Sequence, residues 1–179
     1  MKKVLVTGGV RSGKSWYAEQ SLDANVAAVY VTPGYPADPV ADPEWAARVA
    51  AHQSRRPDCW STLETLDLAG AIAGARSPVL VDCLGTWVTR LLDGWDAWEA
   101  PTSAWQQRLD DETWALAAAL TATTVDVVLV TNEVGWGLVS EHRSGRIFAD
   151  QLGRVNQAVA AACDEVVLMV AGRPLRLPG

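Results

Sequence analysis

The sequence predicts an α/β fold, a three-layer sandwich with a mostly parallel central sheet. Two observations carry this prediction. Short apolar runs alternate along the chain with segments of helical periodicity, which is typical of parallel strands joined by helices. The first apolar run, at residues 4–7, leads directly into the glycine-rich segment GGVRSGKS at residues 8–15. Because the 179 residues contain no linker, repeat or low-complexity stretch, we expect a single domain over residues 1–179.

Residues 8–15 match the pattern G-x-x-x-x-G-K-[ST] of the phosphate-binding loop, or P-loop. Its glycines leave room for backbone N–H groups to surround a triphosphate. Lys14 can then reach the β- and γ-phosphates, and the Ser15 hydroxyl can hold Mg²⁺. Since a strand precedes the loop and a helix can follow it, we predict a nucleotide-binding, P-loop NTPase-like fold rather than a chance glycine-rich turn. The expected nucleotide contacts are Gly8, Gly9, Val10, Arg11, Ser12, Gly13, Lys14 and Ser15.

The next elements follow from local pattern. A helix at residues 16–22 begins where the phosphate loop ends, so that its N-terminus faces the phosphates. The apolar run VAAVYVT predicts a second strand at residues 26–32, and three prolines make residues 33–39 a loop. Asp42 as N-cap and Pro43 at the first helical position then start a helix that ends near residue 52.

The rest of the chain continues the alternation. A helix is expected at residues 66–75, and the strand that follows ends close to an acid, Asp82. A polar connection that carries tryptophans, residues 93–101, separates two helical segments. The remaining strands are expected at residues 78–84, 125–131 and 165–170, and the remaining helices at residues 86–92, 105–122 and 147–163.

Composition excludes several classes of function. The formal net charge of −6 and the pI near 4.8 argue against a nucleic-acid partner, since no basic stripe is visible. No run of about 18 apolar residues occurs, so no membrane span is expected. The N-terminal MKK leads straight into the first strand and the phosphate loop, which does not fit a signal peptide, and we expect a cytoplasmic protein.

Cysteines and tryptophans are both expected to be structural. Cys59, Cys83 and Cys163 are odd in number and lack C-x-x-C spacing, which favours neither a zinc site nor a disulfide framework. Cys83 and Cys163 lie in apolar stretches and should be small core residues. Most of the nine tryptophans fall in helical patterns and should pack in the interior, for example Trp87, Trp98 and Trp114.

Two acids can serve the phosphate loop. Asp82 closes the run VLVD and is expected to hold Mg²⁺ together with Ser15, although a capping role is the alternative. Glu133 closes VLVTNE and competes for the same position. The segment VTNE differs from the N-K-x-D sequence that reads guanine in regulatory GTPases, so a switch GTPase is not expected.

His52 is the histidine with unusual surroundings. Arg48 precedes it by four residues, and Arg55 and Arg56 follow it. A neutral imidazole can attack phosphorus and form a phosphoramidate, and arginines beside it can hold phosphates. On spacing alone, a packing or surface role for this histidine stays open, as it does for His142.

Four further segments occur in a distinctive order. They are RVAAHQSRRPDCWSTLE at residues 48–64, VLVDCLGTWVTRLL at residues 79–92, VLVTNEVGWGLV at residues 128–139 and GRVNQAVAAACDEV at residues 153–166. Together with the phosphate loop, the chain resembles the bifunctional adenosylcobinamide kinase / adenosylcobinamide-phosphate guanylyltransferases of cobalamin biosynthesis. The resemblance covers the chain from residue 3 to about residue 175.

The resemblance implies a transferase with two activities. Such an enzyme phosphorylates adenosylcobinamide from ATP or GTP, with Mg²⁺. It then transfers GMP from GTP to adenosylcobinamide phosphate, which gives adenosylcobinamide-GDP and pyrophosphate. The GMP passes through a histidine–GMP intermediate, and the matching histidine is His52. The resemblance also implies a homotrimer.

Further site residues follow from the resemblance by position. The phosphate-loop pattern adds Lys14 as a catalytic residue beside His52, and Ser15 with Asp82 as the expected metal ligands. Nucleotide contacts outside the phosphate loop are implied for Thr32, Pro33, Gly34, Gln53, Ser54, Arg55, Arg56, Glu64 and Asp82.

Two other readings stay open at this point. A P-loop kinase for another small metabolite would need Lys14, Ser15 and an acid, but not His52 or the Arg55–Arg56 pair. A regulatory module that binds nucleotide without transfer chemistry would leave the segment TNEVGWG, residues 131–137, unexplained.

Overall fold

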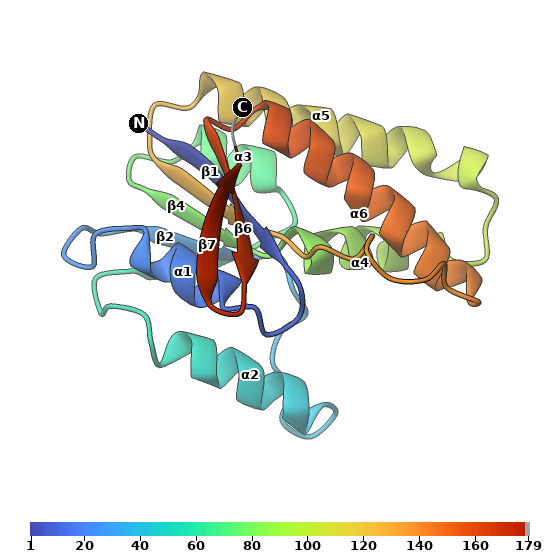
Figure 1. Cartoon of the computed structure of the whole chain (residues 1–179), viewed down its shortest axis with the longest axis horizontal. Helices are drawn as coiled ribbons and strands as arrows, with labels where there is room; N and C mark the ends of the chain where they lie inside the picture. Colours follow the sequence, from blue (N-terminus) through green and yellow to red (C-terminus); the bar gives the residue numbers. More distant parts are fainter. Residues whose placement is uncertain (178–179) are drawn as a thin grey trace.

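The computed structural model describes residues 1–177 and is built on a seven-stranded sheet in the order β3-β2-β4-β5-β1-β6-β7 (Figure 1). Neighbouring strands pair in parallel, except that β6 and β7 form an antiparallel hairpin at one edge. The predicted α/β fold with a mostly parallel sheet is confirmed.

The strands are β1 (Lys3–Gly8), β2 (Val29–Thr32), β3 (Ser61–Glu64), β4 (Val79–Asp82), β5 (Val127–Val130), β6 (Glu165–Val170) and β7 (Arg173–Leu177). The helices are α1 (Lys14–Gln20), α2 (Pro43–Gln53), α3 (Leu68–Ala73), α4 (Leu84–Gly94), the short 3-10 turn η1 (Thr102–Ala104), α5 (Gln106–Ala122) and α6 (Arg143–Ala161).

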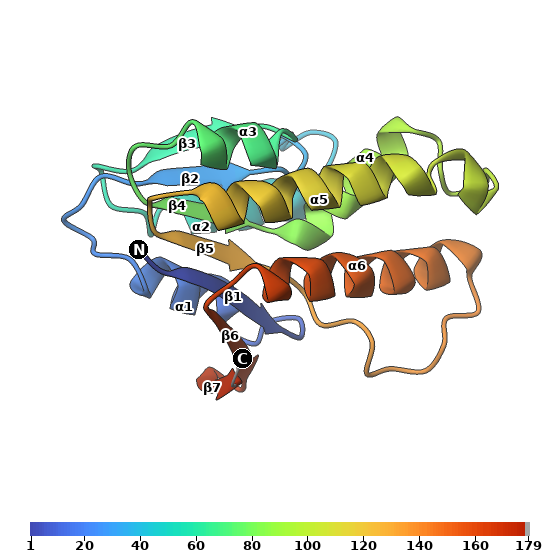
Figure 2. The ribbon, with the colours of Figure 1, turned by 90° about the horizontal axis from the view of Figure 1, so that it is seen from above.

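Apolar side chains cover both faces of the central strands. In β4, Val79 and Val81 face a core shared with α3, α4, α5 and α6, while Leu80 faces a second core shared with α1. Runs of valine and leucine therefore suit these strands, because a parallel strand is buried on both sides. Figure 2 shows α4, α5 and α6 extending together past the end of the sheet. Over residues 1–177, no helix has the length and apolar character that crossing a bilayer requires.

The structure differs from the sequence-based elements mainly at the edges. Strands β3 and β7 were not predicted, and both are edge strands whose residues are all exposed. Helix α6 begins at Arg143 rather than at residue 147, because its first turn is polar and gives no apolar signal. Helix α4 begins at Leu84, a position expected to end the preceding strand.

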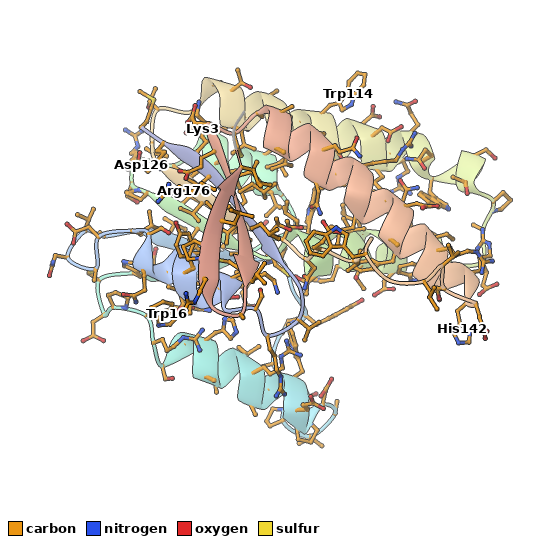
Figure 3. All side chains as sticks on the ribbon, in the orientation of Figure 1. Lys3, Trp16, Trp114, Asp126, His142 and Arg176 are labelled. Atoms are coloured by element: carbon orange, nitrogen blue, oxygen red, sulfur yellow. The ribbon has the colours of Figure 1, made fainter. Side chains whose placement is uncertain are left out.

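The tryptophans divide into interior and surface residues. Trp87 is 1% exposed and donates through Nε1 to the Leu66 carbonyl at 2.9 Å, as a packing role predicts. Trp98 packs partly buried against the same core. The prediction for Trp114 is wrong: this side chain is 73% exposed and points away from α5 (Figure 3), because it lies on the outer face of that helix.

The cysteines are only partly interior. Cys83 and Cys163 are half-buried and pack against the second and the first core respectively, while Cys59 is exposed. All three are free thiols. Burial, followed by the charge of Asp164, raises the pKa of Cys163 to about 12, so this thiol stays neutral.

The parallel pairing places several polar residues at one edge of the sheet. The carboxyl ends of parallel strands meet at the same edge, which is where open α/β sheets bind ligands. Here that edge receives the phosphate loop after β1, Thr32 from β2, Glu64 from β3 and Asp82 from β4. Asn132 follows β5 at the same edge.

We predict that Trp87→Ala will lower the free energy of unfolding by about 3–5 kcal/mol, because it opens a cavity and leaves a carbonyl without its donor. Trp114→Ala is the matched control and should change that free energy by less than about 0.5 kcal/mol. Urea unfolding of both variants, followed by circular dichroism, measures the difference. Equal losses in the two variants would contradict the placement of these side chains.

Candidate active site

The phosphate loop joins β1 to α1 and has the backbone that its glycines allow. Gly13 has φ of 92°, a left-handed conformation that other residues rarely adopt. A Cβ on Gly8 would lie 2.6 Å from Ser12 Oγ and 2.7 Å from the Met169 carbonyl oxygen, so no side chain fits there. Lys14 Nζ reaches back across the loop and donates to the Gly9 carbonyl at 3.1 Å.

The β6–β7 hairpin supports this loop from the side. The Gly172 amide, in the turn of the hairpin, donates to the Ser12 carbonyl at 3.0 Å. The Cα of Gly172 would lie 3.4 Å from a Cβ on Gly13. The C-terminal hairpin therefore limits where the phosphate loop can move, a function that the sequence did not reveal.

Asp82 lies at the end of β4 and accepts a hydrogen bond from a neighbouring strand. Tyr30 Oη, on β2, donates to Asp82 Oδ2 at 2.8 Å. Burial alone would raise the pKa of Asp82, but hydrogen bonds from His52 and Tyr30, the charge of His52 and the Ser15 hydroxyl outweigh it and hold this pKa below its ordinary value. Burial and the same carboxylate raise the pKa of Tyr30, which remains a neutral donor.

His52 projects from the last turn of α2 toward two carboxylates. Its Nδ1 lies 3.4 Å from Asp82 Oδ2 and 3.8 Å from Glu19 Oε1, and 3.5 Å from Tyr30 Oη. Because acceptor oxygens face Nδ1, we assign the proton of the neutral ring to that nitrogen. Nε2 then carries the lone pair, as a nucleophile requires.

One face of α2 forms a wall of the cleft. Trp45, Arg48, Val49, His52 and Gln53 follow helical spacing and line a cavity of about 280 Å³. The N-terminus of α2 is capped by Asp42, as predicted: its side chain accepts from the Trp45 amide at 2.9 Å. The cavity is also lined by Lys14, Ser15, Tyr30, Thr32, Gly34, Tyr35, Ala37, Arg56, Thr62, Glu64, Asp82, Cys83, Thr86 and Asn132.

The arginines around His52 have different surroundings. Arg55 donates from Nε and Nη2 to the two carboxylate oxygens of Glu19, at 2.9 and 3.0 Å. The guanidinium of Arg56 lies 3.5 Å from the centre of the Tyr30 ring, and its Nη1 donates to Thr62 Oγ1 at 2.9 Å. Arg48 lines the cavity and forms no ion pair with any residue from 1 to 177.

Lys14 lies in the same cavity as Arg48. Burial lowers the pKa of the Lys14 amine and the charge of Arg48 acts in the same direction, whereas Cys83 and Asp82 oppose them. Two cations that face one cleft favour an anion between them. A polyphosphate is the anion that the adjacent loop is built to bind.

Half of the predicted site residues line this one cavity. They are Lys14, Ser15, Thr32, Gly34, His52, Gln53, Arg56, Glu64 and Asp82. Gly8, Gly9, Val10, Arg11, Ser12 and Gly13 lie in the phosphate loop and its flanks, outside the cavity lining, as do Pro33, Ser54 and Arg55. Glu133 does not line it either, since its Oε1 accepts from the Gly135 amide at 2.8 Å.

Sequence reasoning missed two groups at the site. Tyr30 and Glu19 contact His52 or Asp82, yet each is an isolated polar residue in an ordinary strand or helix pattern. The cavity residues Tyr35, Trp45, Thr86 and Asn132 were missed for the same reason. Cys83, expected in the core, also lines the cavity, and burial together with Asp82 raises the pKa of its thiol.

Comparisons with known proteins agree over most of the chain. Residues 4–177 match the family of cobinamide kinase / cobinamide phosphate guanyltransferase. The bifunctional adenosylcobalamin biosynthesis protein CobU of Salmonella typhimurium is 41% identical, over 94% of this chain and 96% of that protein. CobU of Escherichia coli is 40% identical over the same shares, and CobP of Pseudomonas aeruginosa is 38% identical over 98% and 96%.

Two solved structures show a weaker likeness to this chain. The P4 protein of bacteriophage phi6 in complex with ADP gives a TM-score of 0.44 at 19% identity, over 97% of this chain and 54% of that one. The flagellar accessory protein FlaH of Methanocaldococcus jannaschii gives a TM-score of 0.46 at 9% identity, over 98% and 76%.

We predict that Asp82→Asn will lower the free energy of unfolding near neutral pH, because the amide cannot carry the charge that His52 and Tyr30 stabilise. The pKa of Asp82 is lowered in the folded state, so the unfolded chain takes up the proton first as the pH falls. The contribution of the Asp82 charge to the free energy of unfolding is therefore complete above the ordinary pKa value of 3.8. It is lost as the pH falls through the folded-state pKa.

Urea unfolding of wild type and Asp82→Asn, from about pH 7 down to about pH 3, measures this difference. The difference in free energy of unfolding between wild type and Asp82→Asn should become smaller only in the acid part of the pH range. Asp150→Asn, which changes an exposed acid on α6, is the control and should leave the curve unchanged. A difference in free energy of unfolding that is the same at all pH values would contradict the lowered pKa of Asp82.

Proposed function

This chain belongs to the cobinamide kinase / cobinamide phosphate guanyltransferase family, and from that premise we propose how its cavity serves both reactions. The enzyme phosphorylates cobinamide and transfers a guanylyl group from GTP to cobinamide phosphate. We propose that the substrate is the adenosyl form and that the guanylyl group passes through His52. The alternatives of a plain metabolite kinase and of a regulatory module lose their support once the family is known.

The observation that carries the histidine intermediate is that His52 and the phosphate-loop lysine line the same cavity. A P-loop kinase needs no histidine there, whereas covalent transfer needs a nucleophile next to the triphosphate. The carboxylates of Asp82 and Glu19 face Nδ1, which leaves Nε2 as the nucleophile and stabilises positive charge on the ring during attack.

The transfer then takes two displacements. Nε2 of His52 attacks the α-phosphorus of GTP, the bond from that phosphorus to the bridging oxygen breaks, and pyrophosphate leaves. A phosphate oxygen of adenosylcobinamide phosphate next attacks the same phosphorus, the N–P bond breaks, and adenosylcobinamide-GDP forms. In the kinase step, the aminopropanol hydroxyl of adenosylcobinamide attacks the γ-phosphorus of ATP or GTP and loses its proton to solvent. The bond from that phosphorus to the bridging oxygen breaks, and the nucleoside diphosphate leaves.

The cations of the cavity hold the charged groups in place. Lys14 would bind the β- and γ-phosphates and Arg48 a neighbouring phosphate, since both side chains face the cavity. Ser15 and Asp82 would hold Mg²⁺, since both side chains line the cavity and the Ser15 hydroxyl lowers the pKa of Asp82. When bound, Mg²⁺ would neutralise charge on the phosphates.

We assign the nucleoside to the part of the cavity between β2, β3 and the end of α2. Thr32, Gly34, Gln53, Arg56 and Glu64 line it there and offer both donors and an acidic acceptor. Pro33 and Ser54 adjoin these residues in sequence. The homotrimer and the cytoplasmic location remain predictions of the resemblance and of the composition.

Incubation with α-³²P-GTP and Mg²⁺ tests the intermediate. We expect label on the protein that survives base and is lost in acid, because a phosphoramidate has these stabilities. His52→Ala should abolish the label while the protein still binds GTP, since the imidazole supplies the nucleophile and not the phosphate cradle.

Two further variants are compared with His52→Ala in this experiment. His142→Ala should label normally, because that histidine lies at the far end of the molecule from Trp16 beside the phosphate loop (Figure 3). Lys14→Ala should impair both activities, because both use the triphosphate. Full labelling of His52→Ala would show that the guanylyl group does not pass through this residue.

Arg48→Ala tests the second cation. We expect kcat/KM for guanylyl transfer to fall by about 10- to 100-fold, the loss of one charge-assisted contact to phosphate. Steady-state kinetics with GTP and cobinamide phosphate give the value. Arg154→Ala, an exposed arginine on α6, is the control. If the two variants have equal kinetics, Arg48 does not touch a phosphate.

A further inference from the structure

The helix that carries His52 is weakly attached to the rest of the protein. None of the residues of α2 is buried, and irregular segments connect it to β2 and β3. Figure 1 shows α2 standing apart below α1. Trp45, near its beginning, donates through Nε1 to the Tyr35 carbonyl at 2.9 Å, and Tyr35 itself belongs to the preceding loop. Few apolar contacts therefore hold this helix, and its position depends on polar ones.

An ion pair between Arg55 and Glu19 joins the end of α2 to α1. Glu19 lies on α1, and its side chain is 4% exposed. The fork of Arg55 meets both of its carboxylate oxygens, a bidentate arrangement that fixes direction as well as distance. A carboxylate this deeply buried needs such a partner, because an unpaired charge is costly there.

Arg55 also binds the helix end itself. Its Nη1 donates at 3.0 Å to the carbonyl of Ala51, the residue directly before His52. One guanidinium thus joins α1 to the last turn of α2. Glu19 Oε1, which accepts from Arg55 Nη2, is also the oxygen 3.8 Å from His52 Nδ1.

The geometry points to Arg55 and Glu19 as positioning residues for guanylyl transfer: together they clamp the end of α2 so that His52 faces the phosphate loop. This inference rests on the proposed function of His52. It assigns Arg55 a different role from the nucleotide contact that the resemblance implies, because Arg55 does not line the cavity and its donors already have partners.

Measuring the two activities separately distinguishes a positioning role of Arg55 from a nucleotide contact. Phosphorylation of cobinamide does not use His52, so loss of the clamp should leave the kinase step unchanged and slow only labelling of the protein. A nucleotide contact would instead raise the KM for the triphosphate in both steps, since they share the phosphate loop.

The experiment compares wild type, Arg55→Ala, Arg55→Lys and the surface control Arg154→Ala. The initial rate of protein labelling is measured with saturating α-³²P-GTP, and cobinamide phosphorylation with γ-³²P-GTP. We expect Arg55→Ala to label about 10- to 100-fold more slowly, the effect of a misplaced nucleophile, with kinase rate and GTP KM unchanged. Arg55→Lys should restore part of the rate, because lysine supplies one donor but not the fork.

Glu19→Gln gives a second test of the clamp, so that the conclusion does not depend on the Arg55 variants alone. If Arg55 acts through Glu19, then Arg55→Ala should slow labelling less in the Glu19→Gln background than in wild type. Equal slowing in both backgrounds would overturn the clamp. Thermal unfolding of each variant identifies any loss of the fold itself.

The remaining outcomes are distinct. Wild type without label at His52 would overturn both the proposed function and this inference. Labelled wild type with an equally fast Arg55→Ala would overturn the clamp alone. A rise in GTP KM in both reactions of Arg55→Ala would place Arg55 on the nucleotide and would also overturn the clamp.

Discussion

The parallel pairing of β1, β5, β4, β2 and β3, in that order, is the constraint on which the active site depends. Strand ends that meet at one edge place Lys14, Asp82 and Glu64 around a single cavity, although these residues lie far apart in the sequence. Asp82 is fixed because β4 behind it is buried on both faces. A shift of one residue in β4 would turn Asp82 away from Tyr30 and toward the other core.

The cavity has a rigid half and a weakly attached half. The rigid half consists of the phosphate loop, supported by the β6–β7 hairpin, and of Asp82 and Tyr30 on the sheet. The other half is α2, which lacks buried residues. Such a division suits an enzyme with two reactions, because one triphosphate site can stay in place while the histidine side of the cavity adjusts to different acceptors.

Much of the site could be predicted because its chemistry is local in sequence. The phosphate loop, the strand that ends in Asp82 and the segment around His52 each contain their own signal. Glu19 and Tyr30 could not be found in this way, since their roles come from partners 36 and 52 residues away. Strand β3 was missed because its residues are exposed, and β7 because Pro174 and its polar neighbours form a strand only beside β6. The first turn of α6 was missed because it is polar, and its Arg146 donates to the carbonyls of Ser140 and Glu141 in the preceding loop.

Asp82 links the two halves of the cavity. Its Oδ2 accepts from Tyr30 and lies 3.4 Å from His52 Nδ1, and the Ser15 hydroxyl lowers its pKa, so the carboxylate lies between the proposed nucleophile and the phosphate loop. Burial would favour a neutral acid at this position, and only these donors keep the pKa low. Because Tyr30 lies on β2, Asp82 keeps this donor when the end of α2 moves. The phosphate site therefore depends less on the position of α2 than the proposed transfer through His52 does.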